Sequence, residues 1–134
     1  HRDLQELSDL NFTIGGHGYN HPYFNELSFN EQLNEVETCM KWVNYRFPNQ
    51  SKLFAFPFTD FGVSDDLIKR IVLEPNSICD VSFGTSGIQP IRFGKHLQRI
   101  PMEEGGKSGQ NIIRGEILYY LAKKGIGHYK RIND

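Results

Sequence analysis

The chain contains 134 residues, of which 38% are hydrophobic, with 15 basic and 16 acidic side chains and a formal net charge of -1. This length fits one domain with a hydrophobic core, whereas a complete enzyme barrel typically needs about 200 residues or more. The balanced charge, without a long run of either sign, excludes nucleic acid as a partner, and the apolar runs are shorter than the roughly 18 residues of a membrane span.

The first residues predict a helix, a short strand and a loop that contains two histidines. Leucines recur at helical spacing ahead of the apolar segment 12–15, which indicates a strand: Leu4, Leu7 and Leu10. His17 and His21 follow this segment, so we expect them at the carboxyl end of a strand, where α/β folds carry their chemistry. Imidazole is a common metal ligand, and a three-residue spacer lets two rings converge on one ion. The pair is therefore a candidate metal site.

The second helix is predicted from a capping box, in which Ser28 and Glu31 satisfy free amides of the first turn. Four apolar residues at helical spacing continue it: Leu33, Val36, Met40 and Val43. We expect Pro48 to end it.

Strands and helices alternate from there to the end. The apolar segments 53–56, 78–83 and 97–102 predict strands, of which the last is limited to an edge by Pro101. Ser64 is expected to cap a helix between the first two strands. Ser108 is expected to cap a last helix with five apolar residues on one side: Ile112, Ile113, Ile117, Tyr120 and Leu121.

This alternation predicts an α/β fold with a parallel sheet, either open or curved into a barrel, in a single domain over residues 1–134. Open sheet edges would allow a homodimer to form by strand pairing. Cys39 and Cys79 are expected to be buried free thiols. Because the first residues lack both an initiator methionine and the apolar core of a signal peptide, we expect an N-terminally truncated piece of a longer protein.

The segment 14–22, Ile-Gly-Gly-His-Gly-Tyr-Asn-His-Pro, resembles the second motif of the polysaccharide deacetylases, the NodB-homology family of carbohydrate esterases. In that motif a strand ends in His-Ser/Thr-x-x-His, often followed by proline. Gly18 stands here in place of the hydroxyl residue, a departure that keeps both histidines. The resemblance implies that His17 and His21 are metal ligands.

A second resemblance lies at the expected distance downstream. The segment 53–62, Leu-Phe-Ala-Phe-Pro-Phe-Thr-Asp-Phe-Gly, is similar to the third motif of the family in the branch that reads Phe-Ala-Tyr-Pro-Tyr-Gly. It lacks the arginine of the commoner form, and Thr59 departs from the branch pattern. The resemblance implies that Pro57 and Phe58 line a substrate groove, and Tyr19 is a further residue that can stack on a sugar.

The resemblance implies a distorted or partial (β/α) barrel of the deacetylase type and a metal-dependent hydrolase. A divalent ion, zinc by default, would be held by two histidines and a carboxylate, and acetyl groups would be removed from N-acetylated or O-acetylated sugars of a glycan or polysaccharide. It also implies a bacterial protein of the cell envelope or a secreted one.

The first motif of the family, Thr-Phe-Asp-Asp-Gly, supplies the third ligand and the general base, and it has no counterpart in this sequence. Asp65 and Asp66 open a helix and are interpreted as capping residues. Asp60 is the acid in a motif loop near the presumed site: it is either a partner of a metal ligand or a surface acid of the loop. The family's last motif requires a histidine at the end of an apolar strand. His96 is expected to precede its strand, so it does not match this motif.

Three alternatives stay open. A non-catalytic carbohydrate-binding remnant would use the aromatic loops without a metal. A phosphate or nucleotide site would use Lys107 and Ser108, although Pro101 stands where a phosphate loop needs glycine. A folded fragment without activity of its own is the third.

Overall fold

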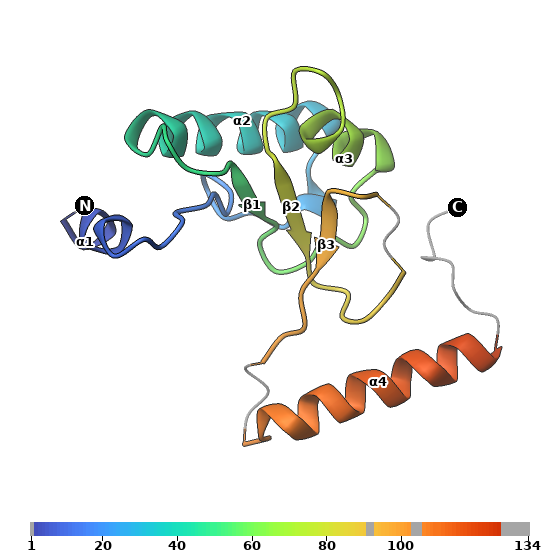
Figure 1. Ribbon diagram of the computed structural model, residues 1–134. Helices are drawn as coiled ribbons and strands as arrows, with labels where there is room; N and C mark the ends of the chain where they lie inside the picture. The colour runs from blue at the N-terminus through green and yellow to red at the C-terminus, as the bar shows by residue number, and fades with distance from the viewer. Residues whose placement is uncertain (1, 91–92, 103–105, 127–134) are drawn as a thin grey trace.

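The computed structural model describes residues 2–90, 93–102 and 106–126 (Figure 1). Five helical elements and three strands follow one another along the chain: α1 (Arg2–Asp9), the 3-10 helix η1 (Phe24–Glu26), α2 (Phe29–Arg46), β1 (Leu53–Ala55), α3 (Asp65–Val72), β2 (Val81–Gly84), β3 (His96–Gln98) and α4 (Gly109–Ile126). The predicted alternation of strands and helices is confirmed.

The three strands form a parallel sheet in the order β1-β2-β3. Leu53 pairs with Val81 and Ser82 with His96, so all three strands end at the same edge, which we call the carboxyl edge. The α/β class is therefore confirmed, with a sheet that is open in the part of the chain that the structure describes.

The strand predicted at residues 12–15 is wrong. Only Gly16 pairs with the sheet, through a parallel bridge to Phe54 in which the Gly16 N–H donates to Leu53 O at 2.8 Å. Upstream of it, the Ile14 N–H donates to the side chain of Gln50 at 2.7 Å, so a side chain takes the place of a strand neighbour. Gly16 fits because a Cβ there would lie only 2.6 Å from Met40 Sδ.

Two other strand predictions are shifted. The predicted strand 78–83 begins later, at Val81, because the Cys79 N–H donates to Ile71 O at the end of α3. The predicted strand 97–102 is shorter and starts at His96. His96 therefore lies within β3, and the expectation that it precedes its strand is wrong.

The core lies between the sheet and the helices α2 and α3, which pack against each other (Figure 1). Both helices begin as predicted: Ser28 and Glu31 form the capping box, and Ser64 Oγ accepts from the Leu67 N–H at 3.2 Å. The side chains that fill the core are mostly aliphatic and aromatic: Phe24, Val36, Met40, Phe54, Phe56, Leu67, Ile68, Ile71 and Val72. Cys39, half-buried, and Cys79, buried, are free thiols.

Helix α4 lies apart from this core, beyond the carboxyl ends of β2 and β3 (Figure 1). Of the apolar residues predicted on one side of it, Ile112 is buried, whereas Ile113, Ile117 and Leu121 are exposed. No described helix combines the length and the apolar character that a membrane span requires.

Candidate functional site

The two histidines lie in an exposed loop at the carboxyl edge, beside the end of β1. His17 Nδ1 is 2.8 Å from Ala55 O. Because a carbonyl oxygen only accepts, Nδ1 must carry the proton, which leaves the lone pair on Nε2. Histidines that bind metals are typically held in this way, with the other ring nitrogen donating to a carbonyl or carboxylate.

The structure brings His21 against His17. Their ring centroids are 4.8 Å apart with an interplanar angle of 71°. His21 also packs edge-on against Phe58, at 4.5 Å between centroids. The two imidazoles are thus in contact, and both side chains are exposed to solvent.

Backbone strain is concentrated at the same contact. His21 and Phe58 have positive φ angles of 55° and 51°, a region that side chains other than glycine seldom adopt. The Phe58 conformation closes a tight turn in which the Thr59 N–H donates to Pro57 O at 2.5 Å. Such strain costs about 1–3 kcal/mol per residue and is typically found where a site must hold a set geometry.

Glu35 of α2 fixes the spacer between the histidines, a role that was not predicted from the sequence. Its carboxylate is buried and accepts the N–H groups of Tyr19, at 2.8 Å, and Asn20, at 2.9 Å, as well as the Asn20 side-chain amide at 2.6 Å. Its partners lie 15 and 16 positions away, so no local pattern reveals them.

Gly18 completes the loop. Its φ is +80°, and a Cβ there would lie 3.0 Å from Pro57 Cγ. A hydroxyl residue would therefore be strained in this loop, which gives a physical reason for the glycine at this position.

Cys39 lies below the loop. Burial raises the pKa of its thiol, while the N–H groups of His17 and Gly18 act in the opposite direction. The thiol therefore stays protonated near neutral pH and is a poor anionic ligand.

Aromatic side chains form a wall next to His21. Phe58 stacks on Tyr23, with centroids 4.1 Å apart and an interplanar angle of 14°, and both rings are partly exposed. Tyr19 is exposed as well. Pro57, in contrast to its predicted place in the groove, is fully buried and supports the loop from below.

Asp60 is fully buried, so the interpretation as a surface acid is wrong. Its carboxylate accepts four hydrogen bonds: from Thr85 N at 3.2 Å, Ser86 Oγ at 3.3 Å, His96 Nε2 at 3.0 Å and Gln98 Nε2 at 2.8 Å. It ties the loop after β1 to the ends of β2 and β3.

Ser82 extends this network inward. Because His96 Nε2 donates to Asp60, Nδ1 is the acceptor, and Ser82 Oγ donates to it at 2.7 Å. Ser82 thus contacts His96, and His96 contacts Asp60, in the same order as the serine, histidine and aspartate of a nucleophilic triad. Ser82 is fully buried on β2, however, so a substrate has no access to its hydroxyl, and the arrangement is structural.

The donor set can be compared with what a metal needs. Among the described residues no group of three or more histidine, cysteine, aspartate or glutamate side chains is placed to hold an ion. A third protein ligand beside His17 and His21 is therefore not supplied by the described residues.

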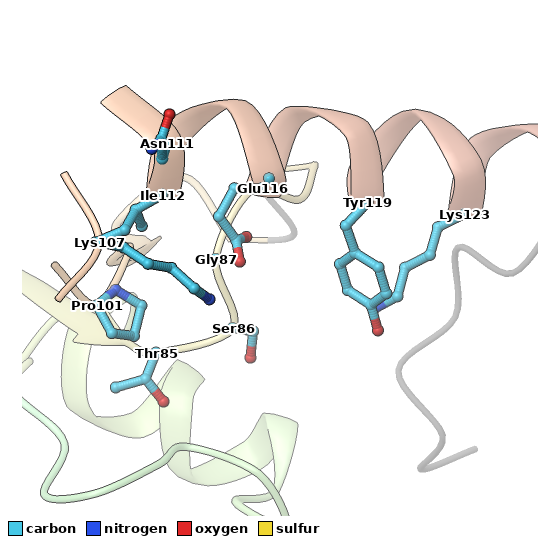
Figure 2. A pocket seen from close by; sticks show the side chains of 11 residues that line it. Thr85, Ser86, Gly87, Pro101, Lys107, Asn111, Ile112, Glu116, Tyr119 and Lys123 are labelled. Atoms are coloured by element: carbon cyan, nitrogen blue, oxygen red, sulfur yellow. The ribbon is translucent and has the colours of Figure 1, made fainter. Parts of the chain in front are cut away.

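A cavity of about 740 Å³ lies between α4 and the loop after β2 (Figure 2). Thr85 and Ser86 line one side, and Asn111 and Tyr119 line the other. Lys107 also lines it, whereas Ser108 does not: its hydroxyl accepts from the Asn111 N–H at 3.4 Å, as the predicted helix cap. The segment 103–105, ahead of this lysine, falls outside the described residues.

Comparisons with known proteins assign no family. The chain matches no protein-family model, no curated protein and no solved structure. The candidate site is therefore judged on its own geometry.

Proposed function

We propose that His17 and His21 are two ligands of a divalent metal site, zinc by default, in a polysaccharide deacetylase-like hydrolase that removes acetyl groups from N-acetylated or O-acetylated sugars. The observation that carries this proposal is the hydrogen bond from His17 Nδ1 to Ala55 O, which places the ring proton on Nδ1 and leaves the Nε2 lone pair available to a metal. The contact of the two rings and the strain at His21 support it.

A bound divalent ion would supply an acidic water and a positive charge next to the acetyl carbonyl. The chain's own residues hold the site in shape. Glu35 fixes the spacer of the loop, and Ala55 O fixes the tautomer of His17. The stacked pair Phe58 and Tyr23 offers an aromatic surface beside His21 for the apolar face of a sugar ring.

The proposal also includes the wider architecture. The three strands and the bridge at Gly16 would form part of a distorted (β/α) barrel, and the edges of the sheet, open in the described part of the chain, would pair with further strands or with a second copy of the chain. Activity would require a carboxylate ligand and a base in addition to the two histidines, because Asp60 is engaged elsewhere.

Metal binding is the direct test. Titration with Zn²⁺, or with Co²⁺ followed by its visible spectrum, should show one site in the chain and a loss of affinity in the double variant His17→Ala, His21→Ala. The variant His128→Ala is the control, because it removes an imidazole from another part of the sequence and should leave the affinity unchanged. Equal affinity in the chain and the double variant would remove the metal interpretation.

A second candidate function is carbohydrate binding without a metal, favoured by the stacked and partly exposed rings of Phe58 and Tyr23. Glycan binding that persists in a chelator and disappears in Phe58→Ala would support it over the hydrolase. The phosphate or nucleotide alternative predicts that a nucleotide raises the thermal midpoint of the chain and that Lys107→Ala abolishes the effect.

A further inference from the structure

We propose that the cavity between α4 and the loop after β2 is a second ligand site, which binds a polyhydroxylated ligand such as a segment of a glycan. For the class of ligand this inference rests on the proposed function, but it does not depend on the metal. The volume of the cavity, about 740 Å³, lies within the range of about 300–1,000 Å³ that is typical of small-molecule sites.

The position of the cavity is that of a binding site in an α/β fold. Thr85 and Ser86 directly follow β2, and Pro101 follows β3, so the cavity opens at the carboxyl edge, where ligands of such folds bind. The histidine loop lies at the same edge, beside β1. Since β1 and β2 are neighbouring strands, the two sites lie at the ends of adjacent strands.

The floor of the cavity is held rigidly. Thr85 donates its N–H, and Ser86 its hydroxyl, to the buried carboxylate of Asp60, while the Ser86 N–H donates to Gln98 Oε1 at 2.7 Å. Gly87 continues this floor in a left-handed conformation, φ +67°, so close to Glu116 that a Cβ would lie 2.1 Å from its carboxylate. A floor that is fixed before the ligand arrives lowers the entropy lost on binding.

The lining indicates the chemistry of the ligand. The Tyr119 ring and Ile112 offer apolar surface, whereas Thr85 and Ser86 offer neutral donors and acceptors (Figure 2). Two ammonium groups, Lys107 and Lys123, stand with one carboxylate, Glu116, and Lys123 lies over the Tyr119 ring at 4.2 Å. Apolar patches that alternate with uncharged hydrogen-bonding groups match the faces and the hydroxyl edges of sugars better than a phosphate, which favours clustered positive charge.

Matched substitutions on α4 test the site. Cello-oligosaccharides and N-acetylated chito-oligosaccharides are titrated into the full chain in the presence of a chelator, and binding is followed by calorimetry or by ligand NMR signals. Tyr119→Ala should weaken binding by about tenfold or more, since it removes the aromatic surface of the cavity. Leu118 is the neighbouring residue, is exposed and does not line the cavity, so Leu118→Ala should leave the affinity unchanged.

The outcomes separate this inference from the metal proposal. Binding that survives the double variant His17→Ala, His21→Ala but is lost in Tyr119→Ala supports the cavity, whether or not zinc binds. Absence of saturable binding to either oligosaccharide overturns it. Binding that is lost in Phe58→Ala and kept in Tyr119→Ala overturns it as well, because the ligand would then lie on the aromatic wall. An unchanged thermal midpoint of each variant shows that the fold is intact.

Discussion

Two buried carboxylates organise the carboxyl edge, and each is stabilised by several donors. Glu35 accepts three hydrogen bonds from Tyr19 and Asn20, and Asp60 accepts four from the segments around β2 and β3. A carboxylate without such partners would be costly to bury. Since the donors lie 15 to 38 positions away along the chain, neither role follows from a local sequence pattern.

The first prediction concerns Asp60. Asparagine keeps the shape of the side chain but replaces one acceptor oxygen with an NH₂ group, which would face donors. We expect Asp60→Asn to lower the free energy of unfolding by about 2–4 kcal/mol, measured by urea denaturation. Asp66→Asn is the control, because the Asp66 side chain is 83% exposed, and it should change the value by less than about 0.5 kcal/mol. A small change in the free energy of unfolding in both variants would contradict a stabilising role of the Asp60 hydrogen bonds.

The second prediction uses one substitution at two glycines. Gly18 has a φ of +80°, and we expect Gly18→Ala to destabilise the fold by roughly 1–2 kcal/mol, because a Cβ is strained there. Gly115 lies inside α4 with open space around its Cβ position, so Gly115→Ala should stabilise by roughly 0.5–1 kcal/mol. Thermal unfolding measures both. A gain in stability at Gly18 would show that the loop is not left-handed there.

At the scale of elements, the structures that depend on local signals were predicted best. The starts of α2 and α3 follow from Ser28 and Ser64, whose caps act within three residues. The strand at 12–15 was wrong because the side chain of Gln50, far along the chain, takes the N–H of Ile14. The histidine pair was found from its spacing alone, whereas the carbonyl that orients His17 belongs to β1 and required the fold.

The third prediction concerns the start of α2. Ser28 donates its hydroxyl and its N–H to Glu31, at 2.6 and 2.8 Å, and these bonds lower the pKa of that carboxyl from its ordinary value. Because the pKa of Glu31 is lower in the folded chain than in the unfolded chain, the ionised carboxylate stabilises the fold. This stabilisation is complete at a pH above the pKa of the unfolded chain, and it is lost as the pH falls through the pKa of the folded chain. The free energy of unfolding, measured from unfolding curves between about pH 6 and pH 3, should therefore fall less in Glu31→Gln than in the unaltered chain.

The control for this prediction lies on the same helix. Glu37 is exposed and does not take part in the capping box, so Glu37→Gln should keep the acid sensitivity of the unaltered chain. The same pH dependence in Glu31→Gln and Glu37→Gln would mean that the capping box contributes nothing to acid stability.

At the scale of the whole molecule, helix α4 is separated from the core that stabilises the fold. The core between the sheet and the helices α2 and α3 contains the fully buried apolar side chains, whereas α4 contributes Ile112 and exposes Ile113, Ile117 and Leu121. Helix α4 is also one wall of the cavity (Figure 2). A wall that adds little to the core can shift to admit a ligand without loss of the fold.

The last prediction tests this separation with two isoleucines. Ile71 is fully buried in α3, and Ile71→Ala should cost about 2–5 kcal/mol of unfolding free energy. Ile117 in α4 is 43% exposed, so Ile117→Ala should cost less than about 0.5 kcal/mol. The free energy of unfolding of both variants is measured by urea denaturation. A loss at Ile117 as large as that at Ile71 would show that the outer face of α4 is covered in solution, and a midpoint that rises with protein concentration would then identify a second copy as the cover.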